Sequence, residues 1–119
     1  MKYQRFATNE LNKISDQRWK VIALLASKKP IAIASNDLEK THPLAHKFNP
    51  NRRSHAEIRC LRKAPKSKTA NSVMYIWRYG KNGELALSKP CEMCMAILRN
   101  FEVKKVIYST SSGFIAMRI

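Results

Sequence analysis

Two short motifs constrain the fold of this chain most strongly, because both carry metal-ligating side chains and both fall at the predicted start of a helix. They read His55-Ala-Glu57 and Pro90-Cys91-Glu-Met-Cys94, with 35 residues between His55 and Cys91. One imidazole and two thiolates are good ligands for a zinc ion and leave its fourth tetrahedral position open. The positive end of each helix dipole favours the thiolate form of the two cysteines. The sequence therefore predicts a fold that brings these two helix starts together.

Apolar periodicity and chain breakers predict an α/β domain. The expected helices cover residues 9–27, 55–64 and 91–100, and the expected strands cover residues 31–35, 72–79, 103–109 and 114–119. The Gly-Lys-Asn-Gly sequence at residues 80–83 predicts a turn, after which residues 84–87 return as the second strand of a hairpin. Because the helix over 91–100 then crosses over to the strand over 103–109, at least one pair of strands is expected to be parallel.

Length and charge limit the architecture and the partners. With 119 residues the chain has room for one domain, which divides into an N-terminal helix within residues 1–29 and a core over residues 30–119. Lys and Arg number 23 against 8 Asp and Glu, which gives a formal net charge of +15. That charge favours an anionic partner such as nucleic acid, a nucleotide or an anionic surface.

Hydropathy argues against membrane and secreted proteins. The longest apolar run, at residues 21–26, has six residues, whereas a membrane span needs about 20. No secretory signal is visible at the start of the sequence, so a cytoplasmic or nuclear protein is expected. In such a reducing compartment, the Cys-x-x-Cys spacing favours metal or redox chemistry over a disulfide.

With H-x-E followed by P-C-x-x-C, the chain resembles the cytidine/deoxycytidylate deaminase superfamily over roughly residues 31–119. The resemblance implies a three-layer α/β/α fold with a mixed sheet of about five strands. It also implies a Zn²⁺ cofactor and the hydrolytic conversion of a cytosine-type base to uracil, with release of ammonia. A tight turn at residues 111–113 predicts that the last two strands form an antiparallel hairpin, which resembles the free-nucleoside and blasticidin-type branch and several deaminase-toxin relatives. The deoxycytidylate and polynucleotide branches join these strands through a helix and run them parallel.

The resemblance assigns roles residue by residue. His55, Cys91 and Cys94 are the expected zinc ligands, and Glu57 is the expected carrier of protons between the zinc water and the base. Four further residues are expected to contact the substrate, the first two through the backbone: Ala56, Ser88, Asn36 and Tyr108. Asn36 is equally well explained as a turn residue, and Tyr108 as a strand tyrosine that packs on a helix.

Basic residues gather around the first motif. Residues 40–68 contain nine basic residues and one acidic residue, which is Glu57. Because a positive field attracts phosphate, this distribution predicts a phosphate-bearing substrate, so the monophosphates of cytidine and deoxycytidine stand beside the free nucleosides. Three other residues are interpreted as structural: Cys60 as a buried core thiol, and Trp77 and Tyr79 as side chains that pack in the sheet.

Several alternatives stay open. A single-stranded DNA or RNA cytosine deaminase would also use the basic charge, and a purine base is a further substrate candidate. A non-catalytic nucleic-acid-binding protein with a structural zinc could take its four ligands from His42, His46, Cys91 and Cys94. That arrangement leaves Glu57 unexplained. A homo-oligomer in which a neighbouring subunit completes the pocket wall is the last alternative.

Overall fold

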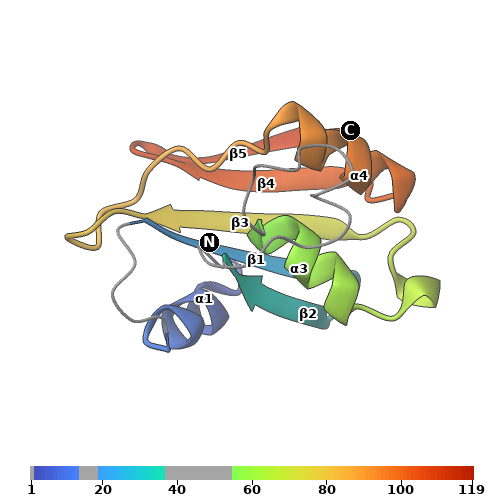
Figure 1. Ribbon diagram of the computed structural model, residues 1–119, viewed down its shortest axis with the longest axis horizontal. Coiled ribbons are helices and arrows are strands. Elements are labelled where there is room, and N and C mark those ends of the chain that lie inside the picture. The colour runs from blue at the N-terminus through green and yellow to red at the C-terminus, as the bar shows by residue number, and fades with distance from the viewer. Residues whose placement is uncertain (1, 14–18, 37–54) are drawn as a thin grey trace.

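Five strands form one mixed sheet in the order β2-β1-β3-β4-β5 (Figure 1). The computed structural model describes residues 2–13, 19–36 and 55–119. The strands are β1 (Lys20–Ala26), β2 (Pro30–Ser35), β3 (Val73–Tyr79), β4 (Lys105–Thr110) and β5 (Gly113–Arg118). The helices of the described residues are α1 (Gln4–Leu11), α3 (Ala56–Lys63) and α4 (Glu92–Asn100), with a short 3₁₀ helix at Lys66–Lys68. The predicted α/β class is therefore confirmed.

The strand directions confirm two predictions about the sheet. β3 and β4 run parallel and are joined through α4, as expected of a crossover connection. β4 and β5 run antiparallel, with Thr110 opposite Gly113 at a tight turn. β1 pairs antiparallel with both β2 and β3, so that β2 and β3 point the same way. β2, at residue 35, and β3, at residue 79, therefore end at the same end of the sheet. One motif follows each of these strands along the chain.

Two hydrophobic clusters fill the two sides of the sheet. On one side, Ala23 and Leu25 of β1 join a cluster with the buried faces of α3 and α4. On the other side, Ile22 and Leu24 pack with Trp77 and with Ala7 of α1. This alternation along β1 is the period of two that a strand imposes, and it places helices on both faces. The result is the predicted three-layer α/β/α arrangement.

A buried hydrogen-bond chain attaches α1 to the sheet. The Trp77 indole N–H donates to Gln4 Oε1 at 3.0 Å, and Gln4 Nε2 donates to the Tyr79 hydroxyl at 2.8 Å. Trp77 is fully buried and Tyr79 is 7% exposed, so their expected role in sheet packing is confirmed. Cys60 is also fully buried, as predicted, and its thiol donates to the Ala32 carbonyl at 3.3 Å.

The prediction of a first helix over residues 9–27 is wrong. The helix covers Gln4–Leu11, and the apolar residues 20–26 form the strand β1. Thr8 and Asn9 lie inside that helix and do not cap it; Tyr3 is the N-cap and its side chain makes no capping hydrogen bond. One face of β1 packs against α1 and the other against α3, so both faces carry apolar side chains. The sequence of β1 therefore lacks the alternation of a half-exposed strand, and for this reason its pattern predicts a helix.

The predicted hairpin is formed only at its turn. The Gly80 N–H donates to the Glu84 carbonyl at 2.9 Å, but the returning residues 84–87 make a single β-bridge, between Tyr79 and Leu85. β3 already has β1 on one side and β4 on the other over residues 73–76, so a returning strand can pair only beyond that point.

None of the helices in the described ranges has the length and apolar character of a membrane span.

Candidate metal centre

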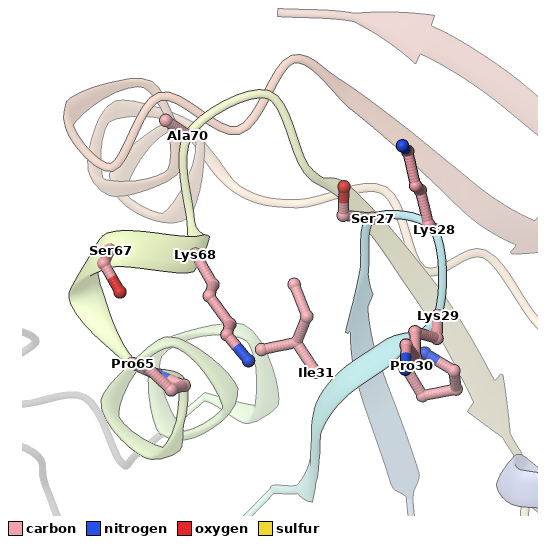
Figure 2. Close-up of a pocket in the computed structure, with 9 residues that line it drawn as sticks. All are labelled: Ser27, Lys28, Lys29, Pro30, Ile31, Pro65, Ser67, Lys68 and Ala70. Carbon is pink, nitrogen blue, oxygen red and sulfur yellow. The ribbon is translucent and has the colours of Figure 1, made fainter.

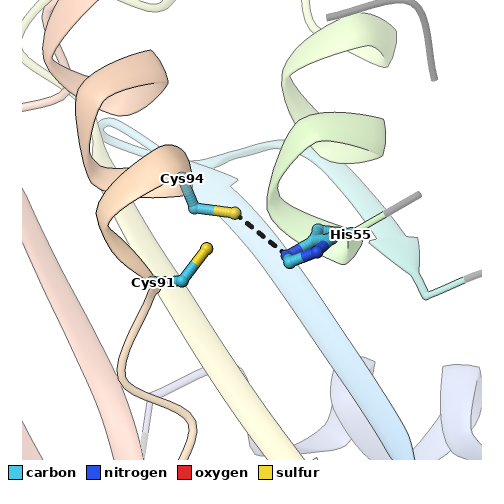
Figure 3. Close-up of side chains that lie close together, drawn as sticks. All are labelled: His55, Cys91 and Cys94. Carbon is cyan, nitrogen blue, oxygen red and sulfur yellow. Dashed lines mark hydrogen bonds between the residues drawn. The ribbon is translucent and has the colours of Figure 1, made fainter. Parts of the chain in front are cut away.

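The starts of α3 and α4 lie together on one side of the sheet, and each presents metal-ligating side chains (Figure 3). His55 is the N-cap residue of α3, Cys91 is the N-cap residue of α4, and Cys94 lies in the first turn of α4. One donor atom from each of the three side chains lies within 4.8 Å of the other two. Cys94 Sγ and His55 Nδ1 are hydrogen-bonded at 3.2 Å. The fold thus brings together side chains that are 36 or more positions apart in the sequence.

The donor set fits a zinc ion. Zinc bonds to cysteine sulfur at about 2.3 Å and to histidine nitrogen at about 2.0–2.1 Å, so donor atoms this close can share one ion. One histidine and two cysteines are also the ligand set of zinc enzymes that keep a fourth position open. Cys94 is fully buried, His55 is half-buried and Cys91 is exposed, so the cluster has an inner wall and an open side. Zn²⁺ is the cofactor that this cluster fits.

Glu57 is a buried acid beside this cluster. It lies in the first turn of α3, two residues after His55, and is 6% exposed. Burial raises the pKa of its carboxyl above the ordinary value, while its own backbone N–H and the charge of His55 lower the pKa in part. Interactions with His55, Cys91 and Cys94 also affect this pKa, so the carboxyl lies next to the cluster. A carboxyl with a raised pKa in a buried site can hold a proton at neutral pH and release it to a base.

The pKa values of the two cysteine thiols are shifted in opposite directions. Hydrogen bonds from Cys94 and His55 lower the pKa of the Cys91 thiol to about 3. The same hydrogen bond with Cys91, together with burial and the neighbouring Glu57, raises the pKa of Cys94. In the metal-free protein, Cys91 is therefore the thiolate and Cys94 the thiol.

This difference predicts a flat pH dependence for alkylation of Cys91. Because a thiol with a pKa near 3 is fully ionised from pH 5 to pH 8, iodoacetamide should label Cys91 of chelator-treated, folded protein at nearly the same rate over that range. The labelling rate of an ordinary cysteine, whose pKa is about 8.5, would instead rise about tenfold for each unit of pH over that range, because its thiolate fraction rises. Mass spectrometry of the labelled peptide measures the rate.

The control in that experiment is Cys60. Burial raises the pKa of its thiol to about 12, so labelling of Cys60 should require unfolding. A Cys91 labelling rate that climbs steeply between pH 5 and pH 8 would contradict the assigned charge state. Added zinc should protect Cys91 at every pH.

The predicted substrate-contact residues fall into different surroundings. Asn36 follows β2, and its side-chain oxygen accepts from the Val21 N–H at 3.0 Å while its amide nitrogen donates to the Trp19 carbonyl at 3.2 Å. Ala56 is buried at the start of α3, next to the metal centre. Tyr108 is 6% exposed and belongs to the core cluster beneath α3 and α4. That these residues contact a substrate remains a prediction.

Ser88 belongs to a buried network that the sequence did not reveal. The Ser88 hydroxyl donates to the Ile76 carbonyl at 3.0 Å and accepts from the Ser109 N–H at 2.8 Å. The Ser109 hydroxyl in turn donates to the Ala86 carbonyl at 2.8 Å and accepts from the Arg78 N–H at 3.0 Å. These bonds hold the segment before the Pro-Cys motif against the ends of β3 and β4, and so position Cys91. Ser109 carries no sequence signal for this role, because only the strand register places it opposite Ser88.

A second feature missed from the sequence is a cation–π pair at the same end of β3. The Arg78 guanidinium lies 4.3 Å from the centroid of the Trp19 ring, and one of its nitrogens donates to the Leu87 carbonyl at 3.2 Å. Trp19 is 39% exposed, so the pair lies at the surface of the protein. The histidines of the alternative zinc site, His42 and His46, lie outside the described residues, as do the basic residues between positions 40 and 53.

Comparison with known families agrees with the geometry of the cluster. The sequence matches the family model of the cytidine and deoxycytidylate deaminase zinc-binding region over residues 1–110. No curated protein matches the chain at a significant level. The matched region contains both motifs, all three residues of the cluster and Glu57, and it spans most of the 119 residues. The chain therefore belongs to the cytidine and deoxycytidylate deaminase zinc-binding family.

Proposed function

We propose that the protein is a hydrolytic deaminase that converts the cytosine base of a nucleoside or nucleotide to uracil and releases ammonia. Family membership and the His-Cys-Cys cluster support a zinc-dependent deaminase-like function. The observation that carries the finer proposal is the buried carboxyl of Glu57 beside a cluster of three ligands. A purely structural zinc site has no use for a buried acid that is not a ligand.

In the proposed reaction, His55, Cys91 and Cys94 hold the metal ion. Bound zinc supplies Lewis acidity that makes hydroxide available from water near neutral pH. Glu57 accepts the proton that this water loses and delivers it to the ring nitrogen beside the reacting carbon. Addition of hydroxide to that carbon forms the new C–O bond. Glu57 then transfers the proton of the added hydroxyl group to the amine, so that the C–N bond breaks as ammonia leaves, and cytosine and one water become uracil and one ammonia. Burial of the carboxyl supports this role, because it favours the protonated form between the two transfers.

The substrate proposal places the free nucleoside and its monophosphate first. The antiparallel pairing of β4 and β5 supports the free nucleoside, because the resemblance associates that ending with the free-nucleoside branch, whereas the positive charge supports the monophosphate. The charge of +15 supports a second candidate, a cytosine in single-stranded nucleic acid. A base in a single strand is also available without the few kcal/mol that extrusion from a duplex costs.

Ammonia release from a substrate panel tests the proposal. Zinc-loaded protein is assayed with cytidine, deoxycytidine, their monophosphates and a single-stranded oligonucleotide that contains cytosine. We expect release from at least one of the monomers and none from thymidine. Release from the oligonucleotide alone would overturn the first candidate in favour of the second. No release from any cytosine substrate, by protein that binds one zinc per chain, would overturn both.

A further inference from the structure

A pocket lies at the far end of α3 from the metal centre (Figure 2). It has a volume of about 490 Å³, and it is walled on one side by the turn between β1 and β2 and on the other by the segment that follows α3. Lys28 and Lys29 come from the turn, whereas Lys68 extends from the opposite wall toward Ile31. Three lysines thus line one hollow from its two walls.

The strand register places the pocket away from the metal-binding motifs. Ala26 lies opposite both Pro30 and Val73, so the β1–β2 turn and the start of β3 share one end of the sheet. α3 begins next to His55 and ends at Lys63, before the wall of the pocket. Eight helical residues at a rise of about 1.5 Å per residue span about 12 Å. The pocket is therefore separated from the metal centre by at least the length of α3.

The surroundings of the pocket are strongly basic. At this end of the sheet the described residues carry one acid, Glu102, against a set of seven basic residues. The basic residues are Lys28, Lys29, Lys66, Lys68, Lys104, Lys105 and Arg118. Within the described ranges the one ion pair is between Lys13 and Glu10, so no carboxylate of the described residues pairs with these lysines. Their charges can attract an external anion.

Hydroxyl groups complete the lining. Ser27 lies on the wall formed by the turn and Ser67 on the wall formed by the 3₁₀ helix (Figure 2). Lysine ammonium groups and serine hydroxyls are among the donors that contact phosphate oxygens in nucleic-acid complexes. The basic residues continue beyond the pocket along the end of the sheet, so a single phosphate would meet only part of them. A row of phosphates would meet more of them.

The geometry points to a binding site for the phosphate backbone of single-stranded nucleic acid in the pocket lined by Lys28, Lys29 and Lys68. Phosphates follow one another at roughly 3.4 Å along a stacked strand, so about four nucleotides cover the length of α3. A strand with one base at the metal centre can therefore reach the pocket, whereas a mononucleotide cannot contact both. The site binds backbone without reading sequence, and it does not depend on the deaminase reaction.

The test measures binding of a thymidine-only 20-mer by fluorescence anisotropy over a range of salt concentrations. This probe contains no cytosine, so its binding is independent of whether the protein deaminates. The variant carries Lys28→Gln, Lys29→Gln and Lys68→Gln, all exposed positions, so the fold should be retained. The matched control carries Lys2→Gln, Lys13→Gln and Lys81→Gln, which remove the same charge from exposed positions that do not line the pocket.

We expect the pocket variant to bind the 20-mer at least about tenfold more weakly at low salt. The slope of log affinity against log salt should fall by about 2, since each phosphate contact on a single strand contributes about 0.7. The control should keep the slope of the unmodified protein. Equal losses in both variants would show general charge attraction and overturn the site. Equally tight, lysine-dependent binding of thymidine 5′-monophosphate would overturn the nucleic-acid assignment, because a single phosphate would then suffice.

Discussion

Replacing Glu57 by glutamine is expected to lower the deamination rate by about 10²- to 10⁴-fold, which is the usual contribution of a general acid–base group. Glutamine keeps the shape of the side chain and its place beside Cys94 but cannot accept the proton of the attacking water. Because Glu57 is not one of the three clustered ligand residues, zinc should stay at one ion per chain. Steady-state ammonia release and metal analysis of the same preparation measure the two effects.

The matched control for this variant is Glu92→Gln. Glu92 also lies in the first turn of a helix that begins at the metal centre, but it is exposed. Its replacement should change the rate by less than about twofold, since an exposed carboxylate in water interacts weakly with its neighbours. Burial disfavours the charged form of Glu57, so Glu57→Gln should not lower the thermal midpoint at pH 7. A Glu57→Gln enzyme that keeps more than about a tenth of its activity would contradict the proposed proton transfers.

Replacing Cys94 by alanine is expected to remove zinc and activity together. Cys94 is fully buried and is the inner thiol of the cluster, so the variant retains only two of the three protein ligands. Zinc binding contributes to the stability of a fold that forms the site, so the thermal midpoint should also fall and should no longer respond to added zinc. Metal analysis, differential scanning calorimetry and the ammonia assay measure these three losses.

Cys60→Ala separates the loss of a ligand from the loss of a buried sulfur atom. Cys60 is as fully buried as Cys94 and lies on α3, but it is not part of the cluster. Its replacement should cost about 1 kcal/mol of unfolding free energy through the small cavity it leaves, and zinc and activity should be retained. If Cys94→Ala kept one zinc per chain, the His-Cys-Cys assignment would be wrong.

The metal centre could be predicted from the sequence because its geometry is largely local to two helix starts. His55 and Glu57 lie within one turn of α3, and Cys91 and Cys94 lie within one turn of α4. Proline before Cys91 and the apolar spacing of residues 92–100 identify the second helix without further information. The family resemblance then supplied the pairing of the two motifs, which local patterns alone do not specify.

The first strand could not be predicted because the identity of β1 depends on its neighbours. A run of apolar residues at 20–26 is compatible with a buried helix or with a strand covered on both faces. Only the pairing of β1 with β2 and β3, and the helices on either side, decides between them. The same reason explains the hairpin: β4 pairs with β3 over residues 73–76, which leaves residues 84–87 only the end of β3, where they make one bridge, between Tyr79 and Leu85.

The sequence by itself determined the residue types of the candidate metal cluster, the helix starts that carry them and the tight turn between the last two strands, because these depend on residues close together along the chain. Tertiary structure decided what depends on strand register. The register of the strands brings Ser109 into hydrogen-bond contact with Ser88, which precedes the Pro-Cys motif. It also places the turn that carries Lys28 and Lys29 opposite Lys68 at the far end of α3. Contacts of this kind join residues about 20 to 40 positions apart, and no local pattern of side chains encodes them.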